Sequence, residues 1–430
     1  MGGCVRDFLL GRPLQDFDIE VFELNLESLF SLLSGFGPCQ QVGKAFGVIK
    51  LSLNDRDIDF SLPRTETKIG QGHTGFSVIP DPHLTFTQAA ARRDFTINSI
   101  GFDPFSGDYL DPFNGIQDLK AKQLRHTSSA FSEDPLRVLR AMQLAARLEF
   151  EVAPETLALC RTLPLEELPK ERLFEEFKKL FLKASKPSIG LKIAREAGIL
   201  RLFPELQGLI DLPQDPQWHP EGDVWTHTLM VVDEMARLRI QDEPQDLIWM
   251  FAALCHDLGK VSTTQFLEGR WRSLGHEEAG VLPTLTFLER LTSHKALIEA
   301  VTVLVKEHLK PSLLYSAHLK QKVSDAAIRR LAMRVNIESL IVLAKADCFG
   351  RTTPEAILRE FPAGDWLGER AKALKVYTQG PVPIVTGKDL MVLGIAPGPE
   401  MGRLLKKLLE LQVEGIFSTW AEAEAYLPNC

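Results

Sequence analysis

The sequence lacks any apolar stretch long enough to cross a membrane. One of its longer apolar runs, 247–255, is far shorter than the ~20 residues that a membrane-spanning helix requires. The start of the chain also lacks a basic segment followed by an apolar one, which is the pattern of a secretory signal. From these two absences we expect a cytoplasmic protein that has no membrane partner.

Paired cysteine motifs and a surplus of positive charge are missing too. The six cysteines are scattered without a C-x-x-C, which argues against a zinc ribbon or a disulfide framework and favours reduced thiols. The formal net charge of −8 argues weakly against a protein coated in nucleic acid. Residues 118–200 differ, with 15 Lys and Arg against 12 Asp and Glu. This local excess is enough to hold a phosphate backbone, although a solvated helical surface has the same composition.

What the chain does contain is an ordinary globular composition and a distinctive start. Its 430 residues predict roughly two to four domains. Gly2 and Gly3 allow backbone N–H groups to approach a phosphate chain, and the helical segment that follows, with Arg6 in it, can point its N-terminus at that anion. Asp16 and Asp18 then lie in a short apolar strand, where residues i and i+2 share a face and suit Mg²⁺. Taken alone, a glycine turn and a solvated acidic strand are the simpler explanation of this stretch.

A second pair of carboxylates lies in a predicted hairpin. Residues 46–53 and 56–62 have the pattern of two strands around an Asn-Asp turn. Asp57 and Asp59 share one face of the second strand, and either can supply a third metal ligand. The polar segment 62–76 follows with three glycines, which predicts a mobile loop.

Charged and amide side chains gather in the segment RRDFTIN. Arg92 and Arg93 supply donors for triphosphate oxygens, and Asp94 and Asn98 are suitable partners for ribose hydroxyls. A helix start that carries surface charges is the alternative. The later segment 111–119, DPFNGIQDL, has the pattern of a Pro/Gly turn capped by aspartates and predicts a structural connection.

From about residue 120 the pattern becomes helical. Ser132 is a suitable N-cap, and Glu133 and Asp134 suit the first turn of the helix that it would begin. Apolar side chains then recur at helical spacing, and three arginines fall near one side of the helix. The apolar stripe is Leu136, Leu139 and Met142, and the arginines are Arg137, Arg140 and Arg147.

Asp134 and Arg137 are three residues apart and are expected to be neighbours on that helix. Cytosine and adenine each present an amine donor beside a ring-nitrogen acceptor, whereas guanine and uracil present the reverse. The segment EDPLR resembles the base-reading motif of CCA-adding enzymes, and this resemblance implies that Asp134 and Arg137 read the base. A carboxylate that only accepts and a guanidinium that only donates fit C and A and oppose G and U. An ion pair at a helix start is the simpler explanation of the spacing.

The second half of the chain carries a separate set of histidines and aspartates. An adjacent His-Asp pair near a helix end, with an earlier His and a later Asp, resembles the ligand set of HD-type metal phosphohydrolases, which implies a metal site. Two more histidines could complete a second metal position. Imidazole and carboxylate suit Mn²⁺, Ni²⁺, Co²⁺, Fe or Mg²⁺, which activate water against a phosphoester. The set comprises His227, His256, Asp257, His276, His308 and Asp347.

In this order the motifs resemble those of the nucleotidyltransferase superfamily, in the class that holds bacterial CCA-adding enzymes and poly(A) polymerases. The resemblance rests on GGCVRD followed by DFD, and on RRDFTIN, DPFNGIQDL, EDPLR and ERLFEEFKK. The second half resembles HD-type metal phosphohydrolases, and 384–405 resembles a family tail that either caps the HD domain or contacts RNA. Together these resemblances cover nearly the whole chain.

The resemblance implies an α+β fold with a nucleotidyltransferase head that holds a mixed sheet and helices, an all-α neck, a helical HD domain and a helical tail. We expect the head over 1–117, the neck over 118–210, the HD domain over 211–370 and the tail over 371–430. Family members carry a helix and a strand before the two glycines, so the first strand of the head is expected to be missing. The ERLFEEFKK helix is expected to support the neck without taking part in the chemistry.

The resemblance also implies roles. Asp16, Asp18 and Asp59, with Asp59 favoured over Asp57, would be catalytic and hold Mg²⁺. The HD set would hold a divalent transition metal (Mn, Ni, Co or Fe) or Mg²⁺. Nucleotide binding would fall to the residues Gly2, Gly3, Arg6, Arg92, Arg93, Asp94, Asn98, Asp134, Arg137 and Arg140.

The implied activity is template-independent addition of CMP and AMP, from CTP and ATP, to the 3′ end of tRNA. The HD domain would add a metal-dependent phosphatase or 2′,3′-cyclic phosphodiesterase activity. Three alternatives stay open. The first is an A-adding enzyme or a poly(A) polymerase of the same class, and the second is an HD phosphohydrolase whose head is inert. The third is a non-catalytic RNA-binding protein, against which the intact carboxylates and HD ligands argue.

Overall fold

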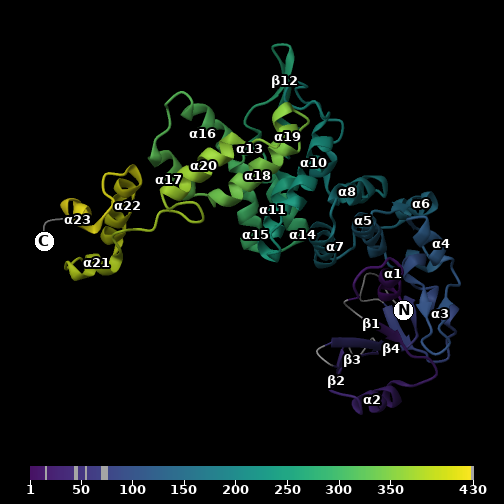
Figure 1. The fold of residues 1–430 in the computed structure, drawn as a ribbon. Coiled ribbons are helices and arrows are strands. Elements are labelled where there is room, and N and C mark those ends of the chain that lie inside the picture. Colours follow the sequence, from purple (N-terminus) through teal and green to yellow (C-terminus); the bar gives the residue numbers. More distant parts are fainter. Residues whose placement is uncertain (15–16, 43–46, 54–55, 69–75, 428–430) are drawn as a thin grey trace. The chain divides into compact units, whose positions relative to one another are not determined.

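The structure, a computed structural model, describes residues 1–14, 17–42, 47–53, 56–68 and 76–427, and Figure 1 shows its helices and strands. The chain divides into two compact units, Met1–Pro204 and Glu205–Cys430. A mixed sheet with helices in the first unit and a mainly helical second unit agree with the predicted α+β class. The division into head, neck, HD domain and tail remains a prediction.

The first unit is built around a four-stranded sheet in the order β1-β4-β3-β2. β1 (Phe17–Glu20) runs parallel to β4 (Arg56–Ser61), whereas β3 (Val48–Leu53) pairs antiparallel with both β4 and β2 (Cys39–Val42). The β3–β4 hairpin confirms the strand pair expected from the sequence.

One face of this sheet is apolar and the other is charged. Ile49 and Leu51 pack against Leu29 and Leu33 of α2 (Leu26–Ser34), which covers that face. Because side chains alternate along a strand, Lys50 points to the opposite face. The sheet therefore presents polar groups on the side that α2 leaves uncovered.

The polar segment that follows β4 is only partly a loop. β5 (Arg64–Lys68) pairs antiparallel with β6 (Phe76–Pro80), so the prediction of a loop over 62–76 was wrong at both ends. Backbone groups that a loop would leave to water are satisfied across this hairpin. The middle of the segment, 69–75, lies outside the described residues.

The helix that carries the arginine side begins later than predicted. Ser132 lies inside a 3₁₀ helix, Ser129–Glu133, whose N-cap is Ser128. α5 runs from Leu136 to Leu148, and Asp134 precedes it in an extended conformation. The physical reason is Pro135, because a proline disfavours the helical conformation of the residue before it.

Three helices form the core that follows the sheet. α5 packs against α7 (Lys170–Lys183) and α8 (Pro187–Glu196), and the predicted stripe of Leu136, Leu139 and Met142 is buried. A Cβ at Gly190 of α8 would come within 2.6 Å of Leu180 Cδ1 and 2.7 Å of the Met142 carbonyl oxygen. Only a glycine allows this close approach of α8 to α5. The remaining described elements of the unit are α1 (Gly3–Leu9), α3 (Phe86–Ala90), a 3₁₀ turn (Thr96–Asn98), β7 (Gly101–Phe102), β8 (Tyr109–Leu110), α4 (Gly115–Lys120), β9 (Gln123–Leu124), β10 (Glu151–Val152), α6 (Pro154–Thr162) and a 3₁₀ helix (Ile199–Leu202).

The second unit is a bundle of helices with one small hairpin. Four helices contact one another at its centre, namely α10 (Val224–Arg237), α11 (Glu243–Cys255), α15 (Lys295–Glu307) and α18 (Ile337–Phe349). The hairpin of β11 (Thr264–Leu267) and β12 (Arg270–Ser273), which projects from the helices in Figure 1, was not expected from the sequence. Around the centre lie α9 (Pro204–Gln207), α12 (Lys260–Thr263), α13 (His276–Ala279), α14 (Val281–Leu291), α16 (Lys310–His318), α17 (Asp325–Ala332), α19 (Pro354–Leu358) and α20 (Pro362–Ala373).

The end of the chain has a small apolar core of its own. Leu390 of α21 (Gly387–Val392) packs with Leu408 of α22 (Pro399–Glu414) and with Ala423 of α23 (Trp420–Ala423). Arg329 of α17 donates to the Val413 carbonyl oxygen and connects α22 to the bundle. Among the described residues, no helix has the length and hydropathy that a membrane crossing demands.

We expect Gly190→Ala to lower the free energy of unfolding by roughly 1–3 kcal/mol, because the added methyl group meets a backbone oxygen that cannot move aside. Gly402→Ala is the control, since Gly402 lies in α22 with no atom within 4 Å of its Cβ position. Urea unfolding followed by circular dichroism measures both. A Gly190→Ala chain as stable as the native one would contradict the close packing of α5 and α8.

Candidate active sites

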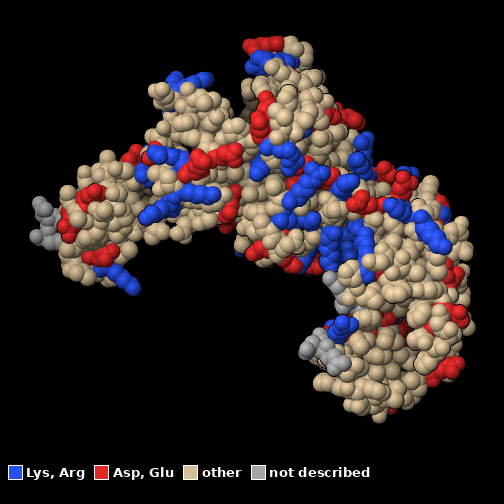
Figure 2. Space-filling view, in the orientation of Figure 1, with Lys and Arg blue, Asp and Glu red and all other residues tan. Residues whose placement is uncertain are grey.

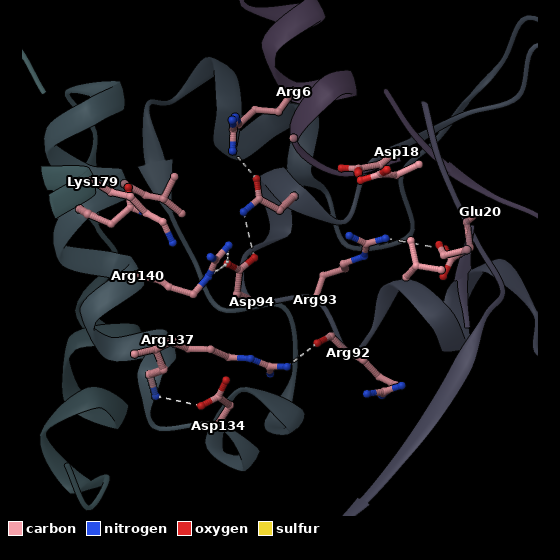
Figure 3. A pocket seen from close by; sticks show the side chains of 18 of the residues that line it. Arg6, Asp18, Glu20, Arg92, Arg93, Asp94, Asp134, Arg137, Arg140 and Lys179 are labelled. Atoms are coloured by element: carbon pink, nitrogen blue, oxygen red, sulfur yellow. Dashed lines mark hydrogen bonds and ion pairs between the residues drawn. The ribbon is translucent and has the colours of Figure 1, made fainter. Parts of the chain in front are cut away.

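A polar cavity of about 650 Å³ lies in the first unit, and Figure 3 shows side chains that line it. Its walls come from β1, β4, the segment after α3, α5 and α7. Among the described residues, ten Lys and Arg but only five Asp and Glu line it. The volume is ordinary for a small-molecule site, and the excess of positive charge favours a polyanion.

Two carboxylates lie side by side in this cavity. Asp18 of β1 is paired in register with Asp59 of β4, and these parallel strands place both side chains on the face opposite α2. Asp59 Oδ1 is buried without a hydrogen bond, and Lys50 Nζ is 3.8 Å from it. An unpartnered carboxylate oxygen beside a second carboxylate fits a divalent cation such as Mg²⁺.

The neighbouring acidic residues are placed differently. Asp57 is exposed and its Oδ1 accepts a hydrogen bond from Ser52 Oγ at 2.7 Å; it is not among the described residues that line the cavity. Asp16 lies outside the described residues. Glu20 does line the cavity, 3.9 Å from Arg93 Nη2; it was not predicted from the sequence although it follows Asp18 by two residues on one strand.

A buried carboxylate holds the cationic wall of the cavity in place. Asp94 Oδ1 accepts from Asn98 Nδ2 at 2.9 Å and from the Phe95 N–H at 2.8 Å, while Asp94 Oδ2 accepts from Arg140 Nε at 2.7 Å. Asn98 Oδ1 in turn accepts from Arg6 Nη1 at 2.6 Å (Figure 3). Burial alone would raise the pKa of Asp94, but Arg140 and these hydrogen bonds outweigh it and lower that pKa. Both carboxylate oxygens of Asp94 are thus engaged within the protein.

The two glycines at the start contribute in different ways. Gly3 lines the cavity. Gly2 has a φ of 80°, which favours glycine, and its N–H donates to the Ile100 carbonyl oxygen. The Gly2 N–H is therefore already used, and Gly2 shapes the path of the chain into α1.

The predicted pair Asp134 and Arg137 lines the cavity, and other groups of the protein bind each of the two side chains. Asp134 Oδ1 accepts from the Leu136 N–H at 3.1 Å, and Oδ2 accepts from Arg172 Nη2 at 2.8 Å. Arg137 donates to the Ala130 carbonyl oxygen at 2.6 Å and to the Arg92 carbonyl oxygen at 2.7 Å. They are not neighbours on one helix surface because Asp134 precedes the helix.

The ERLFEEFKK helix, which was expected to support the neck without taking part in the chemistry, also contributes to the wall of the cavity. Arg172, Lys179 and Lys183 of α7 all line the cavity, and Figure 2 shows Lys and Arg gathered where Figure 1 labels α7. The signal was present in the sequence, since residues spaced by seven and four share one helix face. This face places three cations opposite Asp18 and Asp59.

Arg147 is a further arginine of the cavity, and other positive charges lie near it. Burial, followed by the charges of Arg6, Arg12 and Arg140, lowers the pKa of Arg147. A bound polyanion relieves the electrostatic repulsion among arginines that gather at a cavity wall in excess of the nearby carboxylates. Arg92, whose guanidinium donates to the Arg64 carbonyl oxygen, and Arg93 complete the cationic lining.

A second site lies in the second unit, where all six predicted metal-ligand residues meet. His227 is on α10, His256 and Asp257 follow α11, His276 begins α13, His308 follows α15 and Asp347 is on α18. His227 Nε2 is 3.1 Å from Asp347 Oδ1 and 3.3 Å from His256 Nε2. His276 Nε2 is 3.3 Å from Asp257 Oδ1 and 3.2 Å from His308 Nε2. The six side chains form two groups that can hold a metal ion.

Hydrogen bonds to backbone carbonyls set which imidazole nitrogen faces the centre. The Nδ1 atoms of His256, His276 and His308 lie 2.6–2.8 Å from the carbonyl oxygens of Ala253, Ser273 and Val305. A carbonyl only accepts, so Nδ1 carries the proton and the Nε2 lone pairs converge. Convergent lone pairs beside the buried carboxylates of Asp257 and Asp347 fit a divalent metal.

Burial keeps much of this centre in the form that binds metal. It lowers the pKa of His308 to about 3 and also lowers that of His276. A neutral imidazole is the ligand form, so both histidines stay competent at neutral pH. His227 differs: burial alone would lower its pKa, but Asp347 and Glu221 outweigh burial and raise it.

Several residues around the centre were missed from the sequence. Glu221 Oε1 lies 2.9 Å from Nδ1 of both His219 and His227. Lys260 Nζ is 2.8 Å from Asp257 Oδ2, and Arg351 pairs with Asp347. A Cβ at Gly259 would overlap the His276 carbonyl oxygen, so this glycine permits α13 to approach Asp257. Lys260 and Arg351 follow their aspartates by three and four residues, so helical spacing could have indicated these two pairs, whereas no such spacing indicates Glu221.

Comparison with protein families shows three matching regions. The Poly A polymerase head domain matches residues 1–125, the "Probable RNA and SrmB- binding site of polymerase A" matches 149–209, and the HD domain matches 224–352. The cavity lies within the first two regions and the segment between them, and the histidine centre lies within the third.

Curated relatives match the chain along most of its length. A multifunctional CCA protein of Xanthomonas campestris is 36% identical over 422 residues, which cover 94% of this chain and 95% of the relative. One of Mannheimia succiniciproducens is 38% identical over 397 residues, which cover 88% and 90%.

Solved structures share the fold. The CCA-adding enzyme of Bacillus stearothermophilus in complex with CTP has a TM-score of 0.62 at 19% identity, over 98% of this chain and 89% of that one. The Thermotoga maritima CCA-adding enzyme complexed with tRNA has a TM-score of 0.57 at 21% identity, over 99% and 89%.

We expect Mn²⁺ or Ni²⁺ to stabilise the second unit of the metal-free chain, by about 2.7 kcal/mol at a free concentration one hundred times the Kd. His256→Gln removes a converging lone pair and should abolish most of this gain. His318→Gln is the control, because that ring stacks on Trp366 and lies outside the metal-binding groups. Calorimetry with and without chelator measures the shift, and an equal gain in the His256→Gln chain would contradict the assignment.

Proposed function

The chain belongs to the family of multifunctional CCA proteins, and from this premise we propose that it adds CMP and AMP to the 3′ end of tRNA, with CTP and ATP as donors. The family resemblance seen in the sequence is thereby confirmed. The observation that supports the activity best is one cavity in which Asp18 and Asp59 face a wall of arginines and lysines. Nucleotidyl transfer requires both groups, carboxylates for a divalent metal and cations for the triphosphate.

Each group of the cavity has a distinct task in this reaction. Asp18 and Asp59 hold Mg²⁺, with Asp16 proposed as the third ligand. When bound, the metal lowers the pKa of the attacking 3′-hydroxyl and neutralises charge on the triphosphate. The 3′-oxygen bonds to the α-phosphorus and loses its proton to water, while the bond from that phosphorus to the bridging oxygen breaks and pyrophosphate leaves. Arg92 and Arg93 orient the phosphates.

Base selection is assigned to Asp134 and Arg137. The protein holds Asp134 through Arg172, and it holds Arg137 through the Ala130 and Arg92 carbonyl oxygens. A carboxylate only accepts hydrogen bonds and a guanidinium only donates them, which suits the pair to the edges of C and A. We infer that Arg172 acts on selection by holding Asp134 in place.

For the second unit we propose metal-dependent hydrolysis of phosphate esters, either phosphomonoesters or 2′,3′-cyclic phosphodiesters. The converging imidazoles and carboxylates suit Mn²⁺, Ni²⁺, Co²⁺, Fe or Mg²⁺. When bound, such a metal supplies a hydroxide at neutral pH. The water oxygen bonds to phosphorus, the ester P–O bond breaks, and the departing alkoxide takes up a proton.

Two observations weigh against the alternatives. The relatives are named for CCA, which favours CCA addition over poly(A) synthesis. The cavity retains two paired carboxylates and a full cationic wall, which argues against an inert head.

We expect Asp59→Asn to reduce Mg²⁺-dependent nucleotide addition by about 100-fold or more, because it removes one of the paired carboxylates that hold the metal. Asp57→Asn is the matched control on the same strand and should retain most of the activity, since Asp57 bonds to Ser52 outside the cavity. Incorporation of labelled CTP and ATP into tRNA that ends before CCA measures both. If the Asp57→Asn chain lost activity while the Asp59→Asn chain kept it, Asp57 and not Asp59 would be the metal ligand.

A second substitution tests base selection. Loss of a charged hydrogen-bond donor costs about 1.5–3 kcal/mol, so Arg137→Ala should reduce discrimination against GTP and UTP by roughly 10- to 100-fold. Arg147→Ala should instead weaken the binding of all four nucleotides equally, because Arg147 is assigned to the polyanion. Competition between nucleotides in the addition assay separates the two effects. Unchanged rejection of GTP and UTP by the Arg137→Ala chain would refute the templating role.

A further inference from the structure

Arg351 places a guanidinium beside the metal-ligand candidates of the second unit. Its Nη2 donates to Asp347 Oδ1 at 2.7 Å and to Oδ2 at 2.9 Å, and its Nε donates to Oδ1 at 3.3 Å. These bonds use one edge of the guanidinium. Nη1 has no hydrogen-bonding partner among the described residues, and the side chain is 25% exposed. Arg351 therefore combines a fixed edge with an open edge.

The charges of the centre leave an excess once a metal is bound. Three carboxylates, those of Glu221, Asp257 and Asp347, face two cations, Lys260 and Arg351. One divalent ion already converts this deficit of one positive charge into an excess of one, and a second ion enlarges it. With a metal bound, Lys260, Arg351 and the metal together carry more positive charge than the three carboxylates neutralise. This excess of positive charge attracts an anion.

Exposure shows from which side that anion can approach. The side chains of His227, His256 and Asp257 are at most 2% exposed, so they form the closed side of the centre. Lys260 is 7% exposed, and its Nζ already contacts Asp257 at 2.8 Å and Gln214 Oε1 at 2.7 Å. Of the two cations, Arg351 is the more exposed and has the open donors.

We propose that Arg351 binds the phosphate group of the phosphate ester hydrolysed at this centre, with Nη1 donating to a non-bridging oxygen. The Nε and Nη2 edge stays on Asp347, so one guanidinium bridges a metal ligand and the substrate. A planar fork suits this double contact, whereas an ammonium group cannot reproduce it. The proposal rests on the phosphohydrolase activity proposed above and adds the residue that recognises its substrate.

A competing role is that Arg351 only positions and neutralises Asp347. The two roles predict different measurements. A positioning residue changes the affinity for the metal, whereas a phosphate-binding residue changes the affinity for the anion while the metal remains bound.

The test uses the full chain loaded with Mn²⁺ or Ni²⁺ and the variants Arg351→Gln and Arg351→Lys. The probes are inorganic phosphate, whose Kd is measured by calorimetry, and 2′,3′-cyclic AMP, whose KM and kcat are measured separately. Arg359→Gln is the matched control, because Arg359 also pairs with a buried carboxylate, Glu234, at 2.6 Å and none of its recorded partners belongs to the metal-binding groups. Metal titration of the metal-free chains gives the metal affinity.

We expect Arg351→Gln to raise the Kd for phosphate and the KM for the cyclic nucleotide at least tenfold, with the Kd for the metal changed less than twofold. Arg351→Lys should lie between this variant and the native chain, and Arg359→Gln should match the native chain. CCA addition by the first unit and the melting temperature show that each variant is folded.

Two results would overturn the proposal. One is native phosphate affinity in the Arg351→Gln chain. The other is metal binding weakened tenfold with phosphate affinity unchanged at saturating metal, which would make Arg351 a positioning residue for Asp347. A native chain that binds phosphate through Arg351 but hydrolyses no ester would support the anion site and reject the hydrolase function.

Discussion

The buried carboxylate of Asp94 is the contact on which the catalytic cavity depends. It joins Arg140 of α5 to Asn98, and through Asn98 to Arg6 of α1. A buried charge without partners is costly, so these hydrogen bonds hold three distant segments at fixed positions. The cavity can then carry a large excess of positive charge around Asp18 and Asp59, because the geometry of its wall does not depend on the substrate.

The centre of the second unit has the opposite arrangement, because it is suited to bind a cation first. Its helices bring imidazole lone pairs and carboxylates within about 3–4 Å of one another, an arrangement that calls for a shared cation. Backbone carbonyls orient three of the imidazoles, and Lys260 and Arg351 balance the two aspartates from outside. The two units thus organise opposite partners: the first receives a polyanion, and the second receives a metal whose charge then attracts an anion.

Short sequence motifs supplied most of what could be predicted about the fold and the sites from the sequence. The strand pair around Asp59 follows from alternation, and the histidine set follows from the number and type of residues, because both signals are local or compositional. The start of α5 was placed too early because the effect of Pro135 on Asp134 was not weighed against the capping propensity of Ser132. The segment 62–76 was taken for a loop because polarity and glycines outweighed the strand pairing at its ends.

The sequence by itself determined the family, the order of the motifs and the residue types that the chemistry needs, since these depend on identity and spacing along the chain. Only the tertiary structure decided which of Asp57 and Asp59 lies beside Asp18, because that choice depends on the register between β1 and β4. It also decided that Arg172 bonds to Asp134 and that Arg351 bonds to Asp347. The Arg172–Asp134 pair joins separate elements. The Arg351–Asp347 pair belongs to a metal centre only because other helices bring the histidines next to Asp347. Neither role can be seen from spacing, because both are created when distant segments pack.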